Sequence, residues 1–151
     1  MKKKSTVPET IAYKGYNIPT GKTTNDKKER VQIIKRFYSE WVGENGERKV
    51  KNEHLKHFIH VNHDSVLETK SWACLSHQST LTVLELTYVL KHAVKTEENF
   101  PKNNKRQKRY SKMLIMECVV PQLRPYVNIA KLTIGEVRRG GQKLQYCLTG
   151  K

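Results

Sequence analysis

The sequence lacks the features that would identify a membrane, secreted or zinc-binding protein. It contains no run of about 18 apolar residues, so we expect no membrane-spanning helix. The lysines at residues 2–4 are not followed by the apolar segment of a signal peptide, which favours a cytoplasmic location. Cys74, Cys118 and Cys147 are odd in number and widely spaced, unlike a zinc site or a disulfide framework. We therefore expect reduced cysteines, with Cys118 and Cys147 in the core.

Motifs for several common chemistries are also missing. There is no glycine-rich nucleotide-binding fingerprint and no Gly-x-Ser-x-Gly nucleophile motif. Glu117 and Glu136 are the only carboxylate side chains in residues 101–151, which disfavours paired-carboxylate hydrolysis and a multi-acid magnesium site there. We therefore expect neither a cofactor nor a bound metal.

Positive charge is abundant and unevenly distributed. The 151 residues include 29 Lys and Arg against 14 Asp and Glu, a net charge of +15. Residues 31–100 are neutral, with nine residues of each sign, whereas residues 101–151 hold 12 basic and 2 acidic residues. Because a one-sided positive field attracts polyanions, we predict a nucleic-acid partner, with RNA favoured, and salt-dependent binding. Two alternatives stay open: the charge serves solubility alone, or the partner is a protein.

The order of the patterned segments predicts an α+β fold, with N-terminal helices packed on a C-terminal antiparallel sheet of three to four strands. Residues 1–24 contain few apolar side chains and much Lys, Thr and Gly. We expect them to form a flexible basic arm. Residues 25–151 are expected to form a single domain.

Helix signals occur at three places. Asp26-x-x-Glu29 and Ser65-x-x-Glu68 resemble capping boxes and predict helix starts. The first helix is expected to run for about 16 residues and to end near Glu44-Asn45-Gly46. A third helix of about 15 residues, starting at Ser79 or Thr80, has the broadest apolar face.

Strand signals dominate the second half of the chain. One strand is expected earlier, at residues 57–62, where the pattern alternates. Residues 113–120 form an almost unbroken apolar run, and alternation through residues 130–134 and 144–148 predicts two more strands. Gly140-Gly141 is expected to form the hairpin turn between them.

Two basic segments are candidates for contact with phosphates. A polar connector predicted at residues 96–112 contains the densest basic run, next to a tyrosine that could stack on a base. A solvated loop is an equally open interpretation of this run. The predicted hairpin adds arginines and a lysine on a rigid support. The candidate nucleic-acid-binding residues are Lys105, Arg106, Lys108, Arg109, Tyr110 and Lys143.

Histidines recur every three residues at His54, His57, His60 and His63. On a helix they would form one stripe, but a strand sends residues three apart to opposite faces, so no shared zinc site is expected. Metal-free RNA cleavage needs a proton acceptor, a proton donor and positive charge at the phosphate. Side chains suited to these roles, although their spacing does not show that they converge, are His60, His63, Lys70, Arg138, Arg139 and Tyr146.

Four segments carry a resemblance to known proteins: Ser65-Val-Leu-Glu-Thr through Ser79-Thr80-Leu81, Met113-Leu-Ile-Met-Glu-Cys, Lys131-Leu-Thr-Ile-Gly and Gln145-Tyr-Cys-Leu-Thr. Together, over residues 28–149, they resemble a group of uncharacterised proteins from mobile elements of gut bacteria. Those proteins are similar to domains of large polyvalent phage and conjugative proteins, which have been likened to the barnase, EndoU, colicin and RelE nuclease fold.

The resemblance implies helices followed by an antiparallel sheet and a metal-independent ribonuclease-like domain. Members of that fold often carry a catalytic histidine on or near the helices. This chain has Trp72 in its predicted second helix, and His77 only at the end of that helix. The alternative is therefore a non-catalytic relative, a protein-interaction module of a mobile element.

Overall fold

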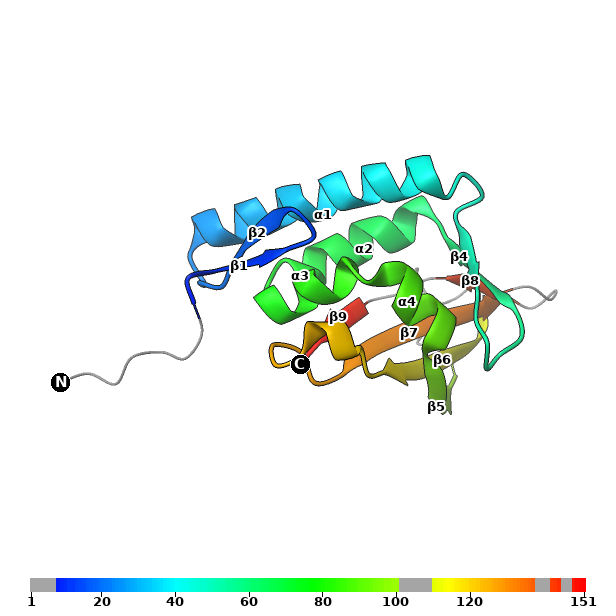
Figure 1. Ribbon diagram of the computed structural model, residues 1–151. Helices are drawn as coiled ribbons and strands as arrows, with labels where there is room; N and C mark the ends of the chain where they lie inside the picture. The colour runs from blue at the N-terminus through cyan, green and yellow to red at the C-terminus, as the bar shows by residue number, and fades with distance from the viewer. Residues whose placement is uncertain (1–7, 101–109, 138–141, 145–147) are drawn as a thin grey trace.

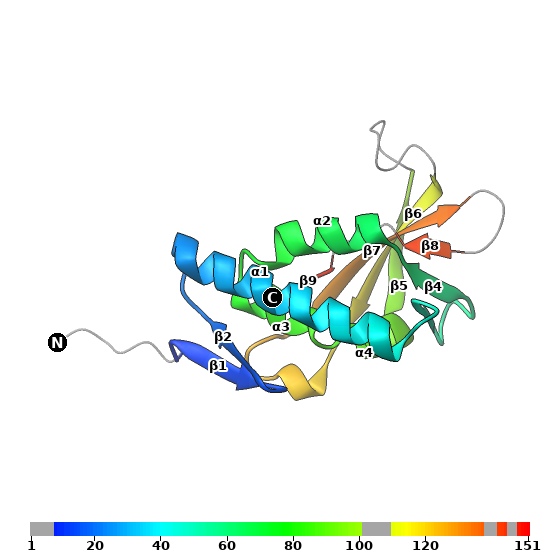
Figure 2. The same ribbon diagram turned by 90° about the horizontal axis from the view of Figure 1, so that it is seen from above.

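The helices lie over one face of a mixed sheet in a two-layer arrangement (Figures 1 and 2). The computed structural model describes residues 8–100, 110–137, 142–144 and 148–151. The α+β class is confirmed. None of the helices in the described part of the chain has the length and apolar character that a membrane crossing requires. In chain order the elements are β1 (Thr10–Tyr13), β2 (Tyr16–Pro19), α1 (Thr24–Glu44), β3 (Lys49–Lys51), β4 (Phe58–Val61), α2 (His63–Ala73), α3 (His77–Val83), α4 (Leu86–His92), β5 (Val94–Asn99), β6 (Tyr110–Cys118), the 3-10 turn η1 (Pro121–Leu123), β7 (Ala130–Val137), β8 (Gln142–Leu144) and β9 (Leu148–Gly150).

The main sheet is larger than the C-terminal sheet that was expected. Its strand order is β3-β4-β8-β7-β6-β5, and β9 also pairs with β7. Strands β5 to β9 pair antiparallel, as predicted, but β4 runs parallel to β8. Two strands from before α2 thus join the C-terminal strands.

The N-terminal region contains a packed hairpin, so the prediction of a flexible arm over residues 1–24 is wrong for residues 10–19. Strands β1 and β2 pair antiparallel, and Tyr13 faces Tyr16 across the turn. The two turn residues, Lys14 and Gly15, both have positive φ (50° and 84°), the backbone that a two-residue hairpin turn requires. Ile11, Tyr16 and Ile18 are buried in the core. Strands therefore precede the helices, which are not all N-terminal.

Both predicted helix starts lie three residues too late. The N-cap of α1 is Thr23, whose side chain accepts from the Asp26 backbone N–H at 3.1 Å, and Asp26 is the N3 residue of the capping box. The N-cap of α2 is Asn62, which accepts the Ser65 N–H at 2.8 Å. The end of α1 at Glu44, with Asn45 as C-cap, agrees with the prediction.

The third predicted helix is two short helices, α3 and α4, separated at Leu84–Glu85. The carboxylate of Glu85 is buried there and accepts hydrogen bonds from Tyr13 Oη at 3.0 Å and Lys14 Nζ at 3.0 Å. The break thus places a buried acid under the β1–β2 hairpin. Residue spacing alone does not reveal this because the apolar residues keep helical spacing on both sides of the break.

The predicted connector at residues 96–112 is shorter than expected, because β5 extends to Asn99 and β6 begins at Tyr110. Residues 101–109 lie outside the described residues. So does the predicted Gly140-Gly141 turn, although β7 and β8 pair antiparallel through Glu136 and Gln142. The predicted last strand is two short ones, β8 and β9.

The core lies between the helices and the facing side of β6, β7 and β9. Leu114 pairs with Ile134 and Met116 with Leu132, and all four side chains are buried. Cys118 is buried and free, as expected, whereas Cys147 lies outside the described residues. Burial raises the pKa of the Cys118 thiol, which keeps it protonated and unreactive.

Candidate nucleic-acid interface

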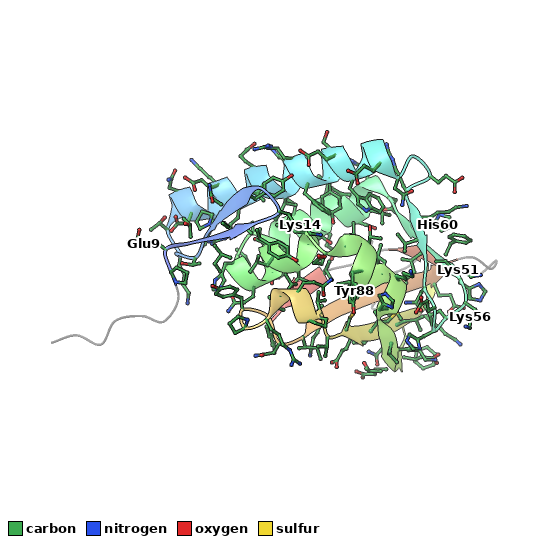
Figure 3. The ribbon with its side chains drawn as sticks, viewed as in Figure 1. Glu9, Lys14, Lys51, Lys56, His60 and Tyr88 are labelled. Carbon is green, nitrogen blue, oxygen red and sulfur yellow. The ribbon has the colours of Figure 1, made fainter. Side chains whose placement is uncertain are left out.

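The β3–β4 hairpin is strongly basic. Residues 48–60 contain four Lys or Arg and three His against a single acidic residue, Glu53. The hairpin forms one edge of the main sheet. Figure 3 shows Lys51, Lys56 and His60 along it, at one end of the molecule. This concentration of positive charge lies within the segment that is neutral when counted over residues 31–100.

The alternation of β4 decides which hairpin side chains face solvent. Ile59 and Val61 are buried, so Phe58 and His60 point to the face of the sheet that the helices leave uncovered. Phe58 is 44% exposed. The register places Lys49 opposite His60 and Lys51 opposite Phe58. We call this group, together with Lys56 in the hairpin loop, the β3–β4 surface.

The aromatic ring of Phe58 is in contact with a cation. Lys49 Nζ lies 4.6 Å from the ring centroid, within the range of a cation–π interaction. Glu47 holds the same ammonium at 3.2 Å. Lys49 is thus positioned against the ring, while much of Phe58 stays open to solvent.

The loop between β3 and β4 is anchored by Asn52, whose side chain is fully buried. Its amide donates to Leu90 O at 2.8 Å and Ala93 O at 2.9 Å. Its carbonyl oxygen accepts the backbone N–H groups of His54 at 3.0 Å and Leu55 at 2.8 Å. The loop that carries Lys56 is therefore held against the end of α4, so its basic residues start from an ordered backbone.

The parallel pairing of β4 with β8 brings together two residues from separate predicted groups. The Cα of His60 is paired with that of Lys143 on one side and with that of Lys49 on the other. His60 is a predicted catalytic residue and Lys143 a predicted nucleic-acid-binding residue. The side chain of Lys143 lies outside what the structure describes, but its backbone position extends the basic row across a third strand.

The other described catalytic candidates lie elsewhere. His63 is the first residue of α2 and is exposed, and Lys70 is half-buried in the last turn of that helix. Residues seven apart share a helix face, so these two lie on one side of α2. Because α2 belongs to the helical layer and His60 points away from it, the structure does not bring His60 together with this pair.

The side chains of the remaining candidates lie outside what the structure describes. Tyr110 begins β6, and only its backbone is described. The proposed roles of Tyr110 and of the candidates outside the described residues stay predictions. The candidates that lie outside the described residues are Lys105, Arg106, Lys108, Arg109, Arg138, Arg139 and Tyr146.

The four spaced histidines do not form a helical stripe. His54 lies in the hairpin loop, His57 precedes β4, His60 is in β4 and His63 opens α2. Within the described ranges, no group of three or more His, Cys, Asp or Glu side chains is arranged to hold a metal ion.

A second surface feature has the opposite charge. A hollow of about 430 Å³ adjoins the end of α1 and carries the carboxylates of Glu44 and Glu47. Trp41 forms part of its wall and donates a hydrogen bond from Nε1 to Thr87 Oγ1 at 2.9 Å. Because a helix C-terminus and two carboxylates repel anions, this hollow does not suit a phosphate ligand.

Sequence reasoning missed the β3–β4 surface because charge was counted over long segments. A shorter window would have found it, since residues 48–60 stand out against the acidic residues around them. The strand alternation at Phe58–Val61, which the sequence did show, then assigns Phe58 and His60 to one face.

Comparisons of this chain with protein-family models, with curated proteins and with solved structures found no match. The resemblance to mobile-element proteins and to a nuclease fold therefore remains an expectation.

Proposed function

We propose that the chain binds RNA through the β3–β4 surface. The observation that supports this is the grouping of Lys49, Lys51 and His60 around the exposed ring of Phe58, on the uncovered face of the sheet. Lysines at such spacing neutralise successive phosphates and release counterions, which is the main source of affinity for a nucleic acid.

The rest of the molecule adds to the same field. The net charge of the chain is +15, and the β4–β8 pairing places the backbone of Lys143 beside His60. A long-range positive field speeds the encounter with a polyanion, and the local lysines then fix its position. Solubility alone requires no such grouping around an aromatic residue.

A charge-matched pair of variants tests the proposal. The first combines Lys49→Gln, Lys51→Gln and Lys56→Gln. The control combines Lys22→Gln, Lys27→Gln and Lys28→Gln, which are exposed positions before and within the first turns of α1. Both lower the net charge by the same amount, but the control lies at the other end of the molecule (Figure 1).

Binding of a labelled RNA is measured by anisotropy between roughly 50 and 200 mM salt, the range over which phosphate contacts are lost. The hairpin variant should weaken binding and flatten the plot of log K against log salt by about 0.7 for each single-strand phosphate contact removed. The control should behave almost as the wild type. If the two variants lose equal affinity, the field is diffuse and the proposed surface is wrong.

Cleavage is tested with the same protein. The His60 imidazole lies beside Lys49 in the strand register, so it could take the proton of a 2′-hydroxyl that attacks its own phosphate while a second group protonates the departing 5′-oxygen. RNA is incubated with the wild type and with His60→Gln in EDTA. Fragments with cyclic phosphate ends that disappear in the variant would show a metal-independent ribonuclease. Intact RNA with retained binding would show a binding protein. Absence of salt-dependent binding would favour the protein-interaction module instead.

A further inference from the structure

We infer that Phe58 is a stacking platform for an unpaired base, so that the β3–β4 surface takes single-stranded rather than double-helical RNA. The inference rests on the proposed function and adds the class of ligand and the residue that selects it. Its starting point is an aromatic side chain that is 44% exposed in the middle of a basic surface.

The position of Phe58 in the strand gives the ring its setting. Its chain neighbour Ile59 is fully buried, which fixes the backbone of β4 against the core. The ring itself projects from the opposite face, beside Lys51 on β3 and two residues from His60 on its own strand. A rigid strand thus presents a flat apolar group to solvent between polar neighbours.

The neighbouring cation covers only part of the Phe58 ring. Lys49 Nζ, 4.6 Å from the ring centroid, leaves the remaining exposed part of the ring available. A base that stacks there would place its phosphates within reach of lysine side chains on the same face. Aromatic stacking and phosphate contact would then act on one nucleotide, the combination used in single-strand recognition.

A double helix cannot use this arrangement along its length. Its base faces are already stacked on one another, so a ring on an open sheet reaches only unpaired bases or the end of a duplex. The duplex would retain the phosphate contacts alone. The surface therefore discriminates by stacking, and the lysines contribute affinity to both forms of RNA.

The test compares two RNAs of the same total length with the full chain. One is a labelled unstructured strand. The other is a duplex whose strands are joined at both ends by oligoethylene glycol linkers, with its label in the stem, so that neither an unpaired base nor a blunt end is available. Competition with unlabelled blunt duplex shows whether stacking on a duplex end contributes. Binding is measured at a fixed salt concentration.

Variants at the ring separate stacking from packing. Phe58→Leu keeps an apolar side chain, and Phe58→Tyr keeps the aromatic ring. The matched control is Trp72→Ala, which removes another exposed aromatic side chain, 53% exposed, from α2 in the helical layer. Thermal unfolding of each variant confirms that it is folded.

Phe58→Leu should weaken binding of the single strand roughly 5- to 150-fold, the range for loss of one stacked base. Binding of the closed duplex should change less than about 2-fold, because phosphate contacts remain. Phe58→Tyr and Trp72→Ala should leave single-strand binding close to that of the wild type.

The outcomes separate this inference from the proposed function. Equal affinity for the two RNAs, or unchanged single-strand binding by Phe58→Leu, would overturn the stacking role while leaving RNA binding in place. If neither RNA binds in a salt-dependent way, the proposed function itself fails.

Discussion

Arg30 shows how one side chain can join three segments of this fold. It extends from α1 and is fully buried. Its Nε donates to Cys74 O at 2.7 Å, and its Nη1 donates to Pro19 O at 2.8 Å and Gly21 O at 2.7 Å. Nη2 is buried and has no hydrogen-bond partner among the described residues. Burial lowers the pKa of Arg30, because a charged guanidinium is costly away from water.

Arg30→Met should destabilise the protein by at least about 3 kcal/mol, because it leaves three carbonyl oxygens without their charged donor. The stability of Arg30→Lys should lie between that of the wild type and that of Arg30→Met, since an ammonium lacks the planar fork that reaches several carbonyls at once. Urea unfolding measures both, with Lys35→Met at an exposed position of α1 as the control. A loss of less than about 1 kcal/mol for Arg30→Met would contradict the role of a clamp.

His77, the first residue of α3, makes the stability dependent on pH. Burial and the charge of Arg30 lower its pKa below the usual value of 6.5. Below pH 6.5 the unfolded chain takes up a proton that the folded chain resists, so stability falls as the pH decreases toward the lowered pKa. His77→Gln should remove this loss. Between about pH 7.5 and pH 5, the free energy of unfolding should therefore fall more for the wild type than for His77→Gln. Equal falls in the two proteins would refute the assignment.

At the scale of the element, the β1–β2 hairpin is part of the core. Tyr16 Oη donates to Glu40 of α1 at 3.0 Å, and Tyr13 and Lys14 hold Glu85 at the α3–α4 break. The hairpin thus bridges two helices that the chain forms later. Burial and the Glu85 carboxylate raise the pKa of Tyr13, so its hydroxyl stays a donor throughout the neutral range.

Ile18→Ala should cost roughly 2–5 kcal/mol, because the side chain is fully buried and the cavity cannot be filled from the surface. Asn17→Ala, at an exposed position of the same strand, should change little. Chemical denaturation of the two variants distinguishes a packed hairpin from a loose arm, since a loose arm would make both substitutions neutral.

At the scale of the whole molecule, α3 and the last strand lock the two layers together. Gly150 N donates to Ser79 Oγ at 3.2 Å, and β9 packs on α3 next to its pairing with β7. A Cβ at Gly150 would overlap Thr82 Oγ1 and lie 3.0 Å from both Gln78 O and Val127 Cγ1. This position disfavours any side chain, because the strand backbone lies directly against the Thr82 hydroxyl and the Gln78 carbonyl of α3.

Gly150→Ala should therefore destabilise the protein by about 1–3 kcal/mol, the cost of forcing an added methyl into a packed interior. Gly46→Ala provides the control, because a Cβ there meets nothing within 4 Å. Thermal unfolding compares the two. Equal midpoints would mean that α3 and β9 are less closely packed than the structure describes.

Features that depend on near neighbours could be predicted from the sequence. The α+β class, the end of α1 and the strand near Phe58–Val61 follow from residue spacing and caps, which act within a turn or a strand. The buried state of Cys118 follows in the same way from its apolar strand. Net charge likewise favours a polyanionic ligand, which stays a proposal, and does not say where on the surface it would bind.

Features that join distant segments could not be predicted from the sequence and follow from the packing of the folded chain. The parallel pairing of β4 with β8 sets His60 beside the backbone of Lys143, and no local pattern encodes which strands meet. The break between α3 and α4 depends on Glu85 being buried under Tyr13 and Lys14, which come from the β1–β2 hairpin. Such contacts depend on competition among many pairings of the whole chain, whereas residue periodicity records only which side of each element is apolar.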